Sequence, residues 1–127
     1  MALFSPAYEA PEVDSAGAAT PELQVELSEV LEGFAQPTDM QFTPGSSDQG
    51  LVLEKGGGVH RFSLGERQSR RIHSFEVSTD SELGLLGLAF HPDFPRDPRV
   101  FVNRTIEARS DGASSTSLTT RIASFVL

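Results

Sequence analysis

From Gln36 onward, short apolar runs alternate with clusters of Pro, Gly, Ser and Asp. Short runs between turn residues are typical of β-strands, and apolar residues at helical spacing are scarce in this part of the chain. The pattern predicts strands around residues 40–42 and at 51–54, 59–64, 71–77, 85–90, 100–105 and 119–126. It therefore predicts an all-β fold, although strand rhythm alone leaves a sandwich, a barrel and a propeller open.

Three consecutive glycines, Gly56 to Gly58, separate two of these strands. Glycine reaches positive φ at little steric cost, so this stretch predicts the turn of a hairpin between residues 51–54 and 59–64. A second connection, residues 106–117, is rich in Ser, Gly and charged residues. Its composition predicts a long loop between the last two strands.

The segment 22–34 fits two structures. Its larger apolar residues form a helical stripe, whereas Leu23, Val25 and Leu27 also alternate as they would in a strand. Gly33 would suit the end of a helix. The pattern by itself therefore favours a helix here.

Residues 1–21 are expected to form a flexible leader, because residues 5–21 combine Pro, Ala, Gly, Ser and acids with almost no large apolar side chain. Met1 to Tyr8 has neither a basic region nor an apolar core, so this chain shows no signal peptide. No stretch approaches the length of apolar sequence that a membrane span needs, and none is expected.

The chain carries a formal net charge of −8, and this charge is unevenly distributed. Residues 1–54 hold ten acids and no Lys or Arg, whereas residues 55–127 hold eight acids and ten bases. An acidic leading half repels phosphate backbones, so no nucleic-acid partner is expected. The absence of Cys excludes a disulfide framework, a thiolate nucleophile and a Cys-ligated metal site.

A distinctive segment, residues 81–103, reads SELGLLGLAFHPDFPRDPRVFVN. It resembles the GLLG-x-A-[FL]-HPDF segment and following strand of the glucose/sorbosone dehydrogenase family, which includes soluble quinoprotein sugar dehydrogenases. Two earlier stretches match in the same order: residues 33–40, GFAQPTDM, resemble the family's entry into its propeller, and residues 53–62, LEKGGGVHRF, resemble its early hairpin. The resemblance runs from about Leu23 to Leu127.

The resemblance implies a six-bladed β-propeller, of which residues 22–127 form only the amino-terminal part. Propeller blades take about 40 to 50 residues each, so this stretch is expected to supply an incomplete ring of about two blades. The resemblance also implies that residues 23–30 form a strand, and not the helix that the pattern favours.

By the same resemblance, the full protein oxidises a sugar hydroxyl to a lactone or carbonyl with pyrroloquinoline quinone (PQQ), usually with calcium, and passes electrons to an external acceptor. The family's histidine base is expected beyond this sequence, as are the calcium ligands, so we expect the chain alone to be inactive. The family implies a periplasmic or secreted location. A non-catalytic propeller used as a binding module is the alternative, and a small self-contained β-domain or a truncated reading frame is a third interpretation.

Glu82 is the candidate pocket residue. The family places a polar residue, often Gln or Glu, two positions before GLLG, near the pocket that receives sugar and quinone. An ionised Glu offers only acceptors and would accept a hydrogen bond from a sugar hydroxyl. The alternative is a solvated acid at the start of a strand, and Asp80 is a second candidate.

The three histidines are interpreted as structural. His91 with Asp93 suggests a base or a metal ligand, but it lies in the HPDF turn, and we expect it to hydrogen-bond that loop. His60 and His73 fall in predicted strands without ligand spacing to each other, so no function is expected for them.

Two further patterns are also interpreted as non-functional. Arg67, Arg70 and Arg71 form a small basic cluster that is expected in a solvated loop. Asn103 and Thr105 match the glycosylation pattern, but they fall in a predicted strand, so the match is attributed to chance.

Overall fold

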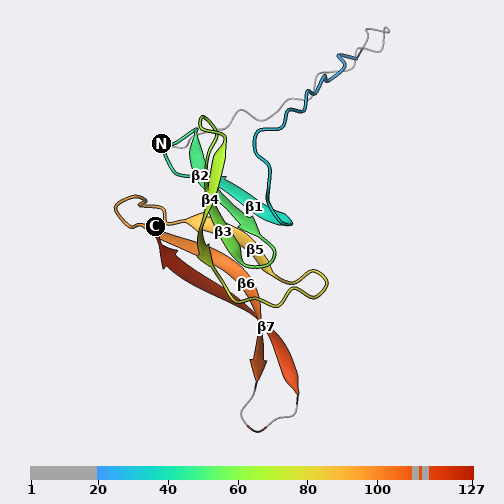
Figure 1. Cartoon of the computed structure of the whole chain (residues 1–127), viewed down its shortest axis with the longest axis vertical. Helices are drawn as coiled ribbons and strands as arrows, with labels where there is room; N and C mark the ends of the chain where they lie inside the picture. The colour runs from blue at the N-terminus through green and yellow to red at the C-terminus, as the bar shows by residue number, and fades with distance from the viewer. Residues whose placement is uncertain (1–19, 110–111, 113–114) are drawn as a thin grey trace.

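Seven strands and no helix make up the described part of the chain, which is residues 20–109, 112 and 115–127 of the computed structural model (Figure 1). The all-β fold predicted from the sequence is confirmed. The leader predicted for residues 1–21 lies almost wholly outside the described residues. Within the described part there is no helix with the length and apolarity to cross a membrane.

The strands form two antiparallel sheets that follow each other along the chain. The first sheet has the order β1 (Pro37–Phe42), β2 (Gln49–Glu54), β3 (Gly58–Ser63) and β4 (Gln68–Ser74). The second has the order β5 (Leu85–Phe90), β6 (Arg99–Arg109) and β7 (Thr116–Val126). Each strand pairs with its neighbour in sequence, so every connection within a sheet is a hairpin.

The glycine turn predicted between β2 and β3 is present. Gly57 has a φ of 106° and donates its N–H to the carbonyl of Glu54 at 2.9 Å. A Cβ on Gly57 would collide with the backbone carbonyl of Phe75. This glycine is therefore required both for its φ and for the close approach of the chain that leaves β4.

The long loop predicted for residues 106–117 is wrong. β6 continues to Arg109 and pairs in unbroken register with β7, from Ile106 opposite Thr119 to Arg109 opposite Thr116. The segment also contains Ile106 and Thr116, whose β-branched side chains fit the pleated surface of a strand. In Figure 1 these two strands extend beyond the rest of the second sheet as a hairpin.

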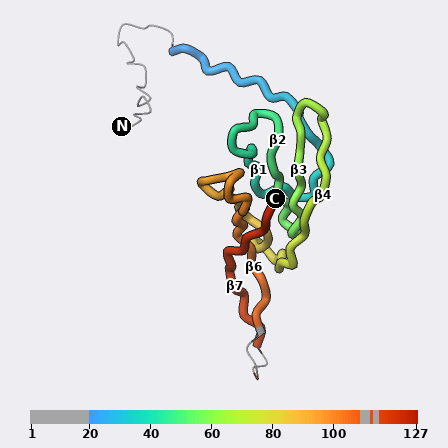
Figure 2. Tube along the Cα trace, turned by 90° about the vertical axis from the view of Figure 1, so that its left-hand side faces the viewer, coloured from blue at the N-terminus to red at the C-terminus, as the bar shows by residue number. Residues whose placement is uncertain are grey.

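Residues 20–34 form neither the helix favoured by their pattern nor the strand implied by the resemblance. Leu23 and Leu27 are 89% and 93% exposed, and this extended arm runs away from both sheets (Figure 2). A helix needs an apolar surface for its stripe, and a strand needs a partner edge. Residues 20–30 are all exposed, and the arm meets a sheet at its end, where the Phe34 ring lies 5.4 Å from the His60 ring of β3. Both predictions are therefore corrected.

The core lies between the two sheets. Leu51, Leu53 and Val59 of the first sheet pack against buried residues of the second, namely Leu85, Leu88, Val100 and Val102. The sheets are also joined by their first strands: Thr38 Oγ1 of β1 donates to the Leu85 carbonyl of β5 at 2.7 Å. Consecutive antiparallel sheets that pack face to face in this way are arranged as neighbouring propeller blades.

Candidate functional site

Glu82 lies in the connection from β4 to β5, directly before the second sheet begins. A turn shapes this connection, in which the Leu83 N–H donates to the Asp80 carbonyl at 3.0 Å and Ser81 has a φ of 54°. The side chains of Asp80 and Glu82 are both exposed. The structure thus brings the two predicted carboxylates to one turn and leaves both accessible to solvent.

Lys55, in the turn between β2 and β3, holds this connection in place. Its Nζ donates to the Ser81 carbonyl, and its own carbonyl accepts the Leu85 N–H at 3.0 Å. Gly84, with a φ of 148°, would place a Cβ 2.5 Å from the Lys55 carbonyl oxygen. Contacts on both sides of Glu82 therefore lock the turn against the first sheet, and nothing in the sequence marked Lys55 for this role.

The carboxylate of Glu54, at the end of β2 next to Lys55, belongs to a side chain that is only 5% exposed. Oε1 accepts the Ala35 N–H at 2.8 Å, and Oε2 lies 2.9 Å from Arg71 NH2 and 3.0 Å from His60 Nε2. Burial by itself would raise the pKa of Glu54, but the hydrogen bonds that its carboxylate accepts outweigh burial and lower the pKa below 4.5. Glu54 therefore stays ionised and anchors the chain where it enters β1.

This cluster corrects the prediction that Arg67, Arg70 and Arg71 share a solvated loop. Arg67 lies in a turn, but Arg70 and Arg71 belong to β4. Arg71 forms an ion pair with Glu54. The sequence shows only a cluster of basic residues, and the partner of Arg71 lies two strands away in β2.

Asp39 supports the second sheet from the first. Its Oδ2 accepts the Leu88 N–H of β5 at 2.8 Å, and its Oδ1 accepts the Met40 N–H at the same distance. Both β1 and β5 carry an irregularity near this contact, between Pro37 and Asp39 and between Leu85 and Gly87. The carboxylate thus bonds to backbone donors and positions β5, which begins just after Glu82.

His91 occupies the opposite end of β5. Its Nδ1 accepts the Asp93 N–H at 3.1 Å, and its Nε2 lies 3.4 Å from Asp97 Oδ2. The predicted role of this histidine in hydrogen-bonding the HPDF turn is confirmed. Asp97 also binds Arg99, whose hydrogen bond lowers the pKa of that carboxyl to about 2.

The remaining candidates take structural positions. His60 contacts Glu54, and His73 stacks on Phe125 with ring centroids 5.4 Å apart. No group of three or more His, Cys, Asp or Glu that could hold a metal occurs among the described residues. Asn103 lies in β6, opposite Ile122 of β7, and is half-buried.

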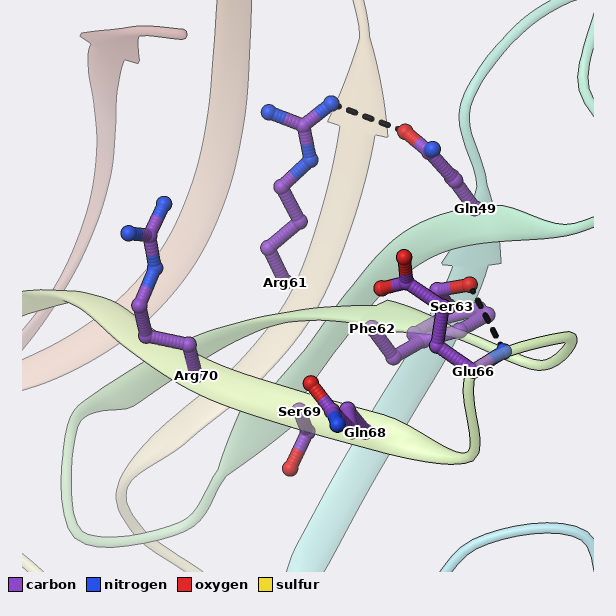
Figure 3. A pocket seen from close by; sticks show the side chains of 8 residues that line it. All are labelled: Gln49, Arg61, Phe62, Ser63, Glu66, Gln68, Ser69 and Arg70. Atoms are coloured by element: carbon purple, nitrogen blue, oxygen red, sulfur yellow. Dashed lines mark hydrogen bonds between the residues drawn. The ribbon is translucent and has the colours of Figure 1, made fainter.

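A hollow of about 350 Å³ lies on the first sheet (Figure 3). It is lined by residues of β2, β3 and β4, including Arg61, whose NH2 donates to Gln49 Oε1 at 2.8 Å. Neither Glu82 nor Lys55 contributes to it. We centre the candidate site on the turn that carries Glu82 because of its position directly before the GLLG motif.

Two antiparallel sheets that follow each other along the chain and share one core fit two consecutive blades of a β-propeller. The Glucose / Sorbosone dehydrogenase family matches residues 34–125, and the chain belongs to this family. The resemblance inferred from the sequence motifs is thereby confirmed.

A solved structure from Thermus thermophilus, described as an oxidoreductase (glucose dehydrogenase), is similar to this chain. The sequence identity is 29% and the TM-score is 0.63. The match covers 78% of this chain and 26% of the Thermus chain, so the protein spans about a quarter of that relative. No curated protein matches the chain.

Proposed function

We propose that this chain supplies two blades of an oxidoreductase that oxidises a sugar hydroxyl to a lactone or carbonyl. The observation that carries the proposal is the presentation of Glu82. Its side chain is exposed, while Lys55 binds the backbone on either side of it, at Ser81 and Leu85. A carboxylate on a fixed turn is pre-organised, so a ligand that binds it loses little free energy to ordering the loop.

In this proposal Glu82 orients the substrate and does not carry out proton transfer. An ionised carboxylate can only accept hydrogen bonds, and a sugar offers several hydroxyl donors. A hydrogen bond to a charged group contributes about 1.5 to 3 kcal/mol, which is enough to select one orientation of a sugar ring. Asp80, whose carbonyl accepts the Leu83 N–H, shapes the turn from the other side.

The cofactors of the family fit this chain only in part. The described residues offer no set of three acidic or histidine side chains for calcium. PQQ, when bound, accepts the electrons of the substrate as hydride while a base removes the hydroxyl proton. We assign that base and the groups that hold PQQ and calcium to other parts of a complete propeller, and to this chain only the contact with sugar.

A chimera tests the proposal. Residues 34–125 replace the matched quarter of the Thermus relative, and dye reduction is measured with PQQ, calcium and a panel of aldoses. The unaltered relative is the positive control, and the 127-residue chain is assayed in parallel. We expect sugar-dependent turnover by the chimera and none by the chain alone.

A folded chimera that binds PQQ but oxidises no sugar would contradict the proposal and would favour the binding-module alternative. The external electron acceptor and a periplasmic or secreted location belong to the same proposal. Both follow from the family. Replacing the dye with periplasmic electron carriers tests the acceptor, and fractionation of cells that express the complete protein tests the location.

A further inference from the structure

A second hollow, of about 410 Å³, lies at the base of the β6–β7 hairpin. One wall is the chain that leaves β4, from Glu76 to Ser78, and the other carries Arg104 and Arg121. The Ser78 N–H donates to the Thr105 carbonyl at 2.8 Å, which fixes the two walls together. The proposed sugar site does not use any of these residues.

Arg104 is held rigidly in this hollow. Its guanidinium carbon lies 5.4 Å from the centre of the Phe75 ring, and its NH1 donates to the Glu76 carbonyl at 3.0 Å. Its Nε is buried without a hydrogen-bond partner among the described residues. A guanidinium held in this way is pre-organised, so a ligand that accepts hydrogen bonds from it loses little free energy to ordering the side chain.

Arg121 lies directly opposite Arg104 in the antiparallel register of β6 and β7. Like charges placed opposite each other destabilise a sheet. No ion pair found within the described residues involves either arginine. The hollow thus contains two guanidinium groups, one of them immobilised, and guanidinium groups bind oxyanions through paired N–H donors.

Glu76 and Glu107 also line the hollow. Their carboxylates would repel a bare anion but would accept hydrogen bonds from hydroxyl groups. The combined lining therefore favours a ligand with one anionic end and several hydroxyls. We propose that Arg104 and Arg121 bind the carboxylate or phosphate of a small polyhydroxylated molecule, such as a sugar acid or a sugar phosphate.

Calorimetric titration of the chain with gluconate, glucose 6-phosphate and glucose tests this site, and the chimera is titrated in the same way. We expect saturable binding of one or both anions, weakened at high salt, because charged contacts at a surface are screened. Which anion binds more tightly identifies carboxylate or phosphate as the source. Glucose lacks the anionic group and is expected to bind at least about tenfold more weakly at this site.

Arg121→Gln removes one guanidinium from an exposed position and should lower the anion association constant at least about tenfold. Arg96→Gln is the matched control, because Arg96 is 86% exposed and lies outside this hollow. Its effect should stay within about twofold. Unchanged anion binding in Arg121→Gln, or no saturable binding of either anion to folded protein, would overturn the proposal.

Discussion

Oε1 of Glu54 accepts the backbone N–H of Ala35 at 2.8 Å, across nineteen residues of sequence. This bond ties the segment that enters β1 to the end of β2, beside the turn that holds the Glu82 connection. The other oxygen, Oε2, contacts His60 of β3 and Arg71 of β4. The buried carboxylate of Glu54 thus connects the segment that enters β1 with β2, β3 and β4. Its removal should therefore lower the stability of the whole first sheet.

Glu54→Gln is expected to lower the free energy of unfolding by about 2 kcal/mol, because a buried charge-assisted contact with Arg71 is lost and the new amide donor faces another donor. Urea denaturation measures this difference. Glu29→Gln is the matched control, since Glu29 is exposed on the extended arm, and it should change stability by less than about 0.5 kcal/mol. Equal stabilities for the two variants would contradict the anchoring role of Glu54.

The pH dependence of stability should reflect the acids with lowered pKa values. The pKa of Asp97 falls from 3.8 to about 2, chiefly through its hydrogen bond with Arg99. A folded-state pKa below the unfolded one stabilises the fold above the unfolded pKa. The stability that Asp97 contributes is therefore present above pH 3.8 and is lost as the pH falls towards 2. The stability that Glu54 contributes is likewise lost as the pH falls below 4.5.

Carboxyl-carbon NMR titration tests the assignment for Asp97. We expect an inflection near pH 2 in the unaltered chain and a shift towards 3.8 in Arg99→Gln. A wild-type inflection at the ordinary value, or no response to loss of the guanidinium, would refute the stated cause.

Gly56 and Gly57, in the turn between β2 and β3, should respond unequally to alanine. Gly57→Ala places a Cβ against the Phe75 carbonyl at a φ of 106°, so we expect a loss of about 2 kcal/mol or more. Gly56→Ala meets nothing within 4 Å and should be neutral to within about 0.5 kcal/mol. Thermal melts compare the two substitutions, and similar melting temperatures would show that the close approach of the chain at Phe75 is not rigid.

Local signals predicted several elements correctly. The strand expected at 85–90 is β5 with the same bounds, because Gly84 precedes the apolar run and Pro92 follows it closely. The glycine turn was also predicted, since it depends on the φ of one residue. The strand expected at 71–77 lies instead at Gln68–Ser74, because Phe75 already leaves the ladder to bond Gly57.

Contacts between distant residues were not predictable in this way. The bond between Glu54 and Ala35 and the lock of Lys55 on Ser81 depend on how the sheets register in space. The arm at residues 20–34 was mispredicted because apolar spacing shows what a segment could bury and not whether a partner surface is present. Glu82 itself was proposed from family motifs, which locate a carboxylate without showing what orients it.

The Michaelis constant for sugar in the Glu82→Gln chimera tests the central claim most directly. The claim predicts a rise of about tenfold in KM with kcat within about threefold, because a binding contact is weakened while the chemistry lies elsewhere. Asp80→Asn, two residues away in the same exposed turn, should leave both constants within about twofold. An unchanged KM in Glu82→Gln, or an equal rise in Asp80→Asn, would contradict the assignment of Glu82 to the sugar.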